Sequence, residues 1–336
     1  MGLLERTQPR LLIVDDEPAN LKVLRQVLQD QYRLSFARSG EAALELLKTE
    51  NIDLILLDIM MPDMTGFDVC ERLKQTPETA RIPVIFVTAL KETIDEEKGF
   101  ALGAVDYITK PIVPAIVRAR VKTHLSLVQA DVLKETQVDL IQRLGRAAEY
   151  KDNETGMHVL RMSHYSYVLA IAAGIDEISA NELMLAAQMH DLGKIAIPDN
   201  ILLKPGRLDE GEFKMMKAHA QIGADILSNP RSQLVALARS IAIAHHEKWD
   251  GSGYPKGLKG KEIPLEGRIA AIADVFDALT SERPYKQAWS VDEAIALLQS
   301  EVGKHFDPEL VPLFVQALPE VINIKNRFAE QIQKSG

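Results

Sequence analysis

The sequence predicts a multidomain protein with an α/β domain built on a doubly wound parallel sheet, a long connecting helix and an all-α domain. Three observations carry this prediction. Apolar runs alternate with helical spacing in the first 125 residues, the stretch 112–150 has no glycine before Gly145 and no proline after Pro114, and helical spacing dominates the rest. The 336 residues suffice for two domains of roughly 100–200 residues each.

Four apolar runs predict strands of the first domain. They lie in LLIVDDEPAN (11–20), IDLILLDIM (52–60), IPVIFVTAL (82–90) and the shorter AVDYITKP (104–111). Segments with helical spacing lie between them, at 21–30, 41–48, 66–74 and 92–101. Because the runs are apolar along their length rather than at alternate residues, they indicate a parallel sheet covered by helices on both faces.

Polar residues stand where these predicted strands end, at Asp15, Asp16, Asp58, Thr88 and Lys110. Ligands of such sheets bind at this edge. Three carboxylates in one crevice repel one another and favour a hard cation such as Mg²⁺. A carboxylate beside Mg²⁺ can attack a phosphoryl group, whose oxygens a hydroxyl and an ammonium group can hold. A single aspartate is more often solvated or capping, but five matching strand ends favour a site.

At these positions the sequence resembles the receiver domain of two-component response regulators, over about residues 9–125. The matched residues are Asp15, Asp16, Asp58, Thr88, Tyr107 and Lys110, with LLDIMMPDMTG around the third of them. The resemblance implies that Asp58 accepts phosphate from a cognate histidine kinase, with Mg²⁺ bound beside it. It also implies that Thr88 and Tyr107 relay the change to a surface that pairs with another receiver.

Residues 126–145 predict a linker helix that continues from the first domain. One apolar stripe comprises Val117, Val121, Leu125, Val128 and Val132, and a second, shifted in phase, comprises Leu133, Leu140 and Leu144. Two interpretations stay open. The stripes can form a short parallel coiled coil in a homodimer, or the helix can pack on its own domain.

The second domain, 146–336, is predicted to be all-α, with helical spacing at 180–190, 208–227, 234–245, 268–280 and 291–302. Eight of its polar residues form a candidate metal-binding set: Glu154, His158, His190, Asp191, His219, His245, His246 and Asp274. The set holds five of the eight histidines of the chain; the other three, His124, His164 and His305, are assigned to core or surface roles.

Imidazole and carboxylate ligands suit iron, manganese, nickel or zinc in an open site. A zinc finger is excluded because its cysteine ligands are missing. Eight ligands exceed the needs of one metal, and an aspartate can bridge two. Metals about 3.5–4 Å apart can activate water and stabilise the leaving oxygen of a phosphodiester. The residues therefore indicate metal-dependent phosphodiester hydrolysis.

Residues 140–336 resemble the HD-GYP phosphodiesterases, a branch of the HD metal-dependent phosphohydrolases. The resemblance rests on MHDLGKIAIPDNIL, KAHAQIG, HHEKWDGSGYPKGLKG and RIAAIADVFDALTSERPYK. It implies a first metal at His158, His190, Asp191 and Asp274, and a second at Asp191, His219, His245 and His246. It further implies that Glu154 helps to hold a third metal, that Asp191 and Lys194 are catalytic, and that the substrate contacts Lys194, Tyr254, Arg283, Tyr285 and Lys286.

The resemblance implies a phosphorylation-regulated enzyme that hydrolyses cyclic di-GMP to linear pGpG, GMP or both. Iron is the first expected metal and manganese the second, with nickel or zinc as further options, and proteins with GGDEF domains are possible partners of the loop 249–260. No residue selects guanine, so cyclic GMP–AMP or another nucleotide stays open as substrate. A non-hydrolytic scaffold that binds a cyclic dinucleotide is the alternative from a different functional class.

The charge and composition argue against several classes of protein. The net charge of −9 argues against broad binding to DNA or to anionic membranes. The sequence MGLLERTQPR lacks the apolar core of a signal peptide, and no run approaches the roughly 18 apolar residues of a membrane-spanning helix. The single cysteine, Cys70, fits a reducing compartment. We therefore expect a cytoplasmic protein without membrane insertion.

Overall fold

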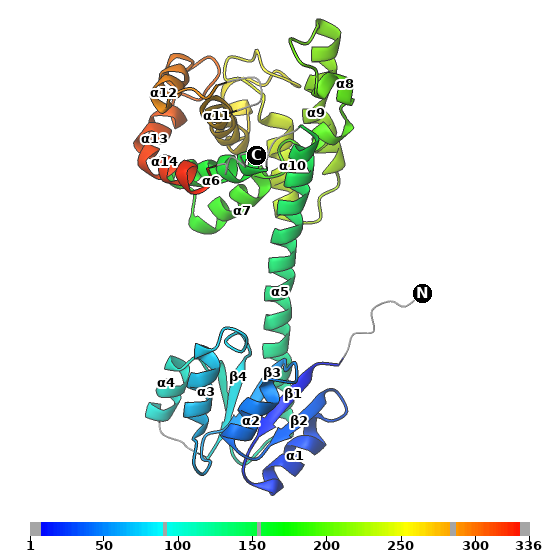
Figure 1. The fold of residues 1–336 in the computed structure, drawn as a ribbon, viewed down its shortest axis with the longest axis vertical. Coiled ribbons are helices and arrows are strands. Elements are labelled where there is room, and N and C mark those ends of the chain that lie inside the picture. Colours follow the sequence, from blue (N-terminus) through cyan, green and yellow to red (C-terminus); the bar gives the residue numbers. More distant parts are fainter. Residues whose placement is uncertain (1–7, 90–92, 153–155, 283–286, 330–336) are drawn as a thin grey trace, which may run out of the picture. The chain divides into compact units, whose positions relative to one another are not determined.

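The structure is a computed structural model that describes residues 8–89, 93–152, 156–282 and 287–329. The chain divides into two compact units, residues 1–135 and 136–336. The first unit contains a five-stranded sheet, and the second is helical (Figure 1). The predicted fold class, an α/β domain followed by a long helix and an all-α domain, is confirmed.

The sheet has the strand order β2-β1-β3-β4-β5, and all neighbouring strands are parallel. Its strands are β1 (Arg10–Val14), β2 (Arg33–Ala37), β3 (Leu54–Asp58), β4 (Val84–Thr88) and β5 (Asp106–Thr109). Strand β2 is not among the four apolar runs, because its sequence RLSFA is only partly buried at the edge of the sheet. The three inner strands are almost entirely buried, which explains their continuous apolar sequences.

Helices cover both faces of this sheet. They are α1 (Pro18–Leu28), α2 (Gly40–Leu47), α3 (Gly66–Gln75), α4 (Thr93–Ala101) and the start of α5 (Pro114–Lys151). One apolar core joins the sheet to α1 and α5, and the other joins it to α2 and α3. Val117, Val121 and Leu125 of α5 are buried in the first of these cores, so this part of the predicted stripe packs on its own domain. The second stripe, Leu133, Leu140 and Leu144, is exposed.

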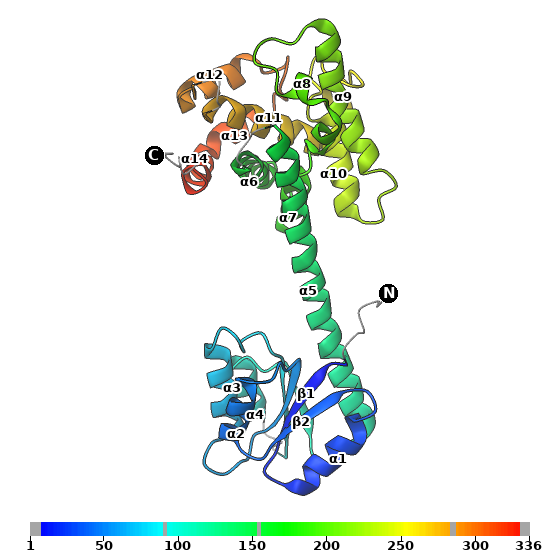
Figure 2. The ribbon, with the colours of Figure 1, turned by 45° about the vertical axis from the view of Figure 1, so that its right-hand side comes forward.

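The second unit has one large apolar core and a smaller cluster around Ile197, Ile201 and Leu202. Its helices are α6 (Met157–Ala172), α7 (Glu177–Ala187), α8 (Asp199–Leu202), α9 (Glu210–Ile226), α10 (Gln233–Ala244), α11 (Leu265–Thr280), α12 (Val291–Ser300), α13 (Leu310–Gln316) and α14 (Leu318–Arg327), with short 3₁₀ turns η1 (Leu192–Ala196) and η2 (Gly260–Glu262). Helix α6 lies against α7, α11 and α14 (Figure 2). None of the helices in the described residues has the length and apolar character needed to cross a membrane.

Candidate metal centre and phosphoacceptor site

The predicted histidines and aspartates converge from five parts of the helical unit. His158 lies in the first turn of α6, His190 and Asp191 between α7 and η1, and His219 within α9, while the other members are His245, His246 and Asp274. The last three come from the end of α10 and from the middle of α11. Most of the set is buried, with His190 fully so. Residues more than a hundred positions apart thus share one interior site.

Four of the side chains form one potential metal-binding group: Asp191, His219, His245 and His246. One ligand atom from each lies within 4.8 Å of the others. Asp191 Oδ1 is 3.3 Å from His219 Nε2 and 3.6 Å from His245 Nε2. The two imidazole Nε2 atoms are themselves 3.4 Å apart, so they point at a common centre.

A second group lies beside the first and consists of His158, His190 and Asp274. Its ligand atoms also lie within 4.8 Å of one another, and His158 Nε2 is 3.3 Å from Asp274 Oδ1. Asp191 connects the two groups, because its Oδ2 lies 3.3 Å from His190 Nε2 while its Oδ1 faces His219. Such a carboxylate between two groups has the geometry expected of a bridging ligand.

The protonation of these groups fits metal ligands. Burial lowers the pKa of His219 and holds that of His246 well below its usual value, which keeps both rings neutral. Burial alone would raise the pKa of Asp191, but Lys194 and His190 beside it hold the pKa well below its usual value. Burial would likewise raise the pKa of Asp274, and the adjacent His158 lowers it instead. His219 and His246 thus offer neutral imidazoles, and Asp191 and Asp274 offer ionised carboxylates.

Two buried polar atoms also fit a metal-binding role. His190 Nε2 and Asp191 Oδ1 have no hydrogen-bond partner among the described residues. Unsatisfied buried polar atoms are costly and rare in native proteins. The Nδ1 atom of His190 faces the Ala187 carbonyl oxygen at 2.9 Å, which leaves Nε2 as the ligand atom. The residues present therefore fit transition metals of the kind that imidazole and carboxylate bind.

Lys194 lies at the edge of the two groups, in η1. Its Nζ is 2.8 Å from Asp191 Oδ2 and donates to Asp152 Oδ2 at 2.6 Å. Asp152 was not among the residues predicted from the sequence, although it stands in the acidic stretch KDNETG before His158. The two carboxylates hold the ammonium group in one place, next to the metal-binding atoms.

The loop after His246 folds back onto the site. The ring of Tyr254 stacks on that of His246 at a centroid distance of 4.7 Å, and the Tyr254 N–H donates to the His246 carbonyl. Buried Glu247 accepts the N–H groups of Lys256 and Leu258 at 2.7 and 3.0 Å. A Cβ on Gly253 would lie 2.3 Å from the Lys248 nitrogen, so this turn requires glycine.

Four predicted site residues lie outside the described residues: Glu154, Arg283, Tyr285 and Lys286. A buried pair behind His158, namely Asp277 and Arg161, is not among the residues predicted from the sequence. In the sequence, this aspartate and this arginine cannot be told apart from ordinary charged residues of the surface. Only their helical spacing from Asp274 and His158, three residues in each case, could have indicated a shared face.

The predicted phosphoacceptor residues also lie together, at the carboxyl edge of the sheet. Ligand oxygens of Asp15, Asp16 and Asp58 lie within 4.8 Å of one another. Lys110 Nζ donates to Asp58 at 2.6 Å and to Asp15 at 2.9 Å. Burial raises the pKa of Asp58, whereas the two carboxylates raise that of Lys110 against the effect of its own burial. Thr88 is buried at the end of β4.

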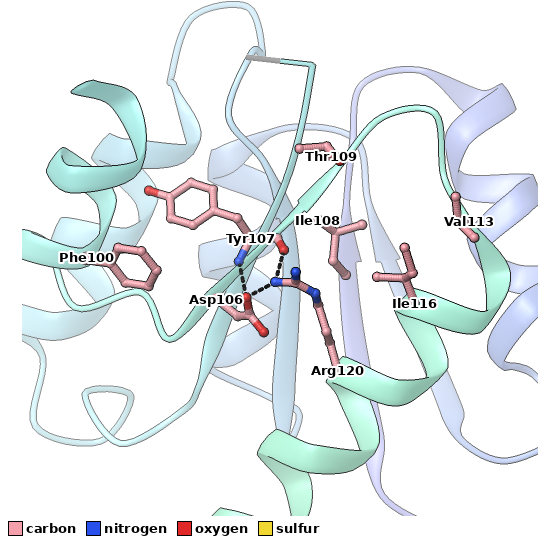
Figure 3. A pocket seen from close by; sticks show the side chains of 8 residues that line it. All are labelled: Phe100, Asp106, Tyr107, Ile108, Thr109, Val113, Ile116 and Arg120. Carbon is pink, nitrogen blue, oxygen red and sulfur yellow. Dashed lines mark hydrogen bonds and ion pairs between the residues drawn. The ribbon is translucent and has the colours of Figure 1, made fainter. Parts of the chain in front are cut away.

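Tyr107 lies on β5, next to a pocket formed by α4, β5 and α5 (Figure 3). Its buried ring packs against Phe86 and Phe100 at centroid distances of 5.4 and 5.2 Å. On the other side of the strand, Arg120 pairs with Asp106 and donates to the Tyr107 carbonyl. The predicted switch residue is therefore on a face that combines exposed apolar side chains with an ion pair.

Comparison with known proteins supports the assignment of both the receiver domain and the helical domain. The sequence matches the HD domain family over residues 128–310 and the response regulator receiver domain family over residues 11–122. A "Probable cyclic di-GMP phosphodiesterase" of Vibrio cholerae is 42% identical over 98% of this chain and 82% of its own length. The "Cyclic di-GMP phosphodiesterase response regulator RpfG" of Xanthomonas campestris is 37% identical over 97% of this chain and 92% of its own length.

A further relative, the "3'3'-cGAMP-specific phosphodiesterase 2" of Vibrio cholerae, is 45% identical over 57% of this chain and 37% of its own length. It matches only part of the present chain, whereas the first two relatives match nearly all of it. The chain belongs to the family of two-component response regulators that join a receiver domain to an HD-type phosphodiesterase domain.

Proposed function

We propose that this protein hydrolyses cyclic di-GMP at the histidine–aspartate centre, under control of phosphorylation at Asp58. The observation that carries the proposal is the pair of buried ligand groups that share Asp191. The names of the two relatives that match almost the whole chain support cyclic di-GMP as the substrate. The expected products are linear pGpG, GMP or both.

In this proposal His158, His190, Asp191 and Asp274 would hold one metal, and Asp191, His219, His245 and His246 would hold the other. Iron is the first expected metal and manganese the second. Metals at such a site would supply Lewis acidity to activate water and to offset charge on the phosphodiester. Glu154, four residues before His158, would help to hold a third metal.

The chain's own residues would position the substrate and balance its charge. Lys194 already lies 2.8 Å from Asp191, so a phosphate at the centre would be within reach of its ammonium group. Asp152 limits the rotamers of that lysine through a 2.6 Å hydrogen bond. Tyr254 forms the wall beside His246, and burial raises the pKa of its hydroxyl, which therefore stays protonated and able to donate. We assign Arg283, Tyr285 and Lys286 to the remaining substrate contacts.

Regulation would begin at the receiver. A histidine kinase would phosphorylate Asp58, with Mg²⁺ at Asp15 and Asp16, and Lys110 and Thr88 would bind the phosphoryl oxygens. We propose that the chain acts as a homodimer. The exposed Phe100, Val113 and Ile116 around the pocket in Figure 3, and the exposed stripe Leu133, Leu140 and Leu144 on α5, support this proposal.

Cyclic GMP–AMP is the second candidate substrate, because a relative named for that activity aligns with part of the chain. Competitive turnover separates the two candidates. Metal-replete full-length protein is given both dinucleotides at equal concentration, with Asp191→Ala as the inactive control, and products are separated by chromatography. We expect cyclic di-GMP to be consumed at least tenfold faster. Faster loss of cyclic GMP–AMP would make that dinucleotide the preferred substrate. Binding of either dinucleotide without turnover would favour the non-hydrolytic scaffold instead.

A further inference from the structure

Asp277 lies directly behind the ligand group that contains His158. It is fully buried on α11, one turn after Asp274, and its Oδ2 is 2.9 Å from His158 Nδ1. The opposite nitrogen of the same ring, Nε2, faces Asp274 Oδ1 at 3.3 Å. Two carboxylates from one helix therefore contact the two nitrogens of one imidazole, and Asp277 is on the side away from the proposed metal.

Arg161 anchors this carboxylate from α6, one turn after His158. Its Nε donates to Asp277 Oδ1 at 2.7 Å and its Nη2 to Oδ2 at 2.9 Å, which makes a two-point pair with both partners buried. The guanidinium also donates to the Phe328 carbonyl at 3.1 Å and to Ser281 Oγ at 2.9 Å. A bidentate arginine fixes both the position and the plane of a carboxylate.

The other histidines of the centre have a different partner on Nδ1. In His190, His219 and His245, this atom faces a backbone carbonyl, at 2.9, 2.7 and 3.0 Å. Among the histidines whose Nδ1 partner the structure describes, His158 is the one that faces a carboxylate. A carboxylate behind an imidazole fixes its tautomer, as a carbonyl does, and also makes the metal-facing nitrogen a stronger donor.

We infer that Asp277, held by Arg161, is a positioning residue that makes the His158 group the tighter of the two metal sites. This inference rests on the proposed function, because it assigns an order to the metals of that centre. The site of His158, His190 and Asp274 fills first, and the site of His219, His245 and His246 fills second. Asp191 belongs to both sites, through Oδ2 beside His190 and through Oδ1 beside His219.

The test is a titration of metal-free full-length protein with Mn²⁺, followed by electron paramagnetic resonance, which distinguishes isolated from coupled ions. For the wild type we expect a first ion that binds at least tenfold more tightly than the second. Asp277→Asn keeps the side-chain shape and should weaken the first step by about 10–100-fold, with the second step unchanged. His246→Ala is the matched variant, which should weaken the second step alone.

Two results would overturn the inference. One is an unchanged first step in Asp277→Asn, and the other is an equal loss in both steps, as a purely structural role predicts. If that variant does not fold, ¹⁵N-histidine spectra of the wild-type apoprotein provide the test, with His158→Gln as the assignment control. We expect the proton of His158 on Nδ1, and a proton on Nε2 would contradict the inference. Two bound metals without dinucleotide turnover would instead refute the proposed function alone.

Discussion

The two candidate sites of this chain balance their charges in different ways. At the receiver site, Lys110 contacts both Asp58 and Asp15, and Asn20 donates to Asp15 as well. At the histidine–aspartate centre, polar atoms such as His190 Nε2 are buried without a hydrogen-bond partner in the described part of the chain. Lys110 thus offsets part of the carboxylate charge at the first site, whereas the second site has buried ligand atoms whose hydrogen-bonding capacity a metal would satisfy.

This difference matches two kinds of task. A carboxylate site whose charge a lysine offsets in part can bind and release a small hard ion at little cost to folding, which suits a transient phosphoryl signal. A buried imidazole–carboxylate site with unsatisfied atoms gains stability from its metals, because metal binding is coupled to folding. We therefore expect the helical unit, and not the receiver, to depend on metal.

The largest effect that tests this contrast is expected from Asp191→Ala. The substitution removes the carboxylate that both ligand groups share, so turnover should fall by roughly three orders of magnitude or more. Metal content should fall with it. Steady-state kinetics and elemental analysis measure both, with the exposed Asp225→Ala on α9 as control. Full metal content and full rate in the Asp191 variant would refute the ligand assignment.

Metal removal should separate the two units in stability. A metal present at a hundred times its dissociation constant adds about 2.7 kcal/mol to the free energy of unfolding. For a domain of about 200 residues this corresponds to a melting temperature lower by about 5–10 °C after chelation. Calorimetry of the full chain, with hydrogen exchange to assign the transitions, should show this loss in the helical unit only. An equal fall in melting temperature in both units would contradict the expected difference between them.

Mild acid, like metal removal, should lower the stability of the helical unit. Burial lowers the pKa of His219, and burial lowers that of His305 to about 4. The unfolded chain therefore binds more protons between pH of about 6.5 and about 4, and the helical unit loses stability as the pH falls through this window. For His305 the full loss is on the order of 3 kcal/mol.

The receiver should behave differently in acid, because burial raises the pKa of Asp58 and its folded state keeps a proton more readily. Thermal unfolding of metal-free protein at several pH values tests the comparison, with His305→Gln as the control that flattens the profile. The expected difference is wrong if the unfolding temperature of the receiver falls with pH in parallel with that of the helical unit.

A smaller change is expected from Glu154→Ala. If this glutamate helps to hold a third metal, the variant should lose at most one metal per chain while the two ligand groups around Asp191 keep theirs. Metal-to-protein ratios of the variant and the wild type, prepared in parallel without oxygen, give the result. An unchanged ratio would count against a third site.

The smallest expected effect on basal chemistry is that of Asp58→Asn. The phosphoacceptor belongs to the receiver unit, so turnover without activation should stay within about twofold of the wild type. The response to the phosphoryl mimic BeF₃⁻ should disappear, because the carboxylate that it modifies is gone. Activity measured with and without BeF₃⁻ tests both statements, and a persistent response would place the signal elsewhere.

Much of the fold could be predicted from the sequence, because buried strands and helix faces leave a periodic apolar pattern. Strand β2 is not among the predicted strands because it is only partly buried, and helices α6, α8, α13 and α14 fall outside the predicted helical segments. The ligand residues could be predicted because imidazoles and carboxylates recur in a recognisable order. The pair of Asp277 and Arg161 could not, since their contact exists only once α6 packs on α11.

Stepwise reconstitution of the metal-free full-length protein with Fe²⁺ under anaerobic conditions tests the two-metal centre directly. Bound metal and cyclic di-GMP turnover are measured after each addition. We expect turnover to stay low through the first metal per chain and to rise as the second is bound, with pGpG or GMP as product. Full turnover of the metal-free protein, or none with both sites filled, would contradict this expectation.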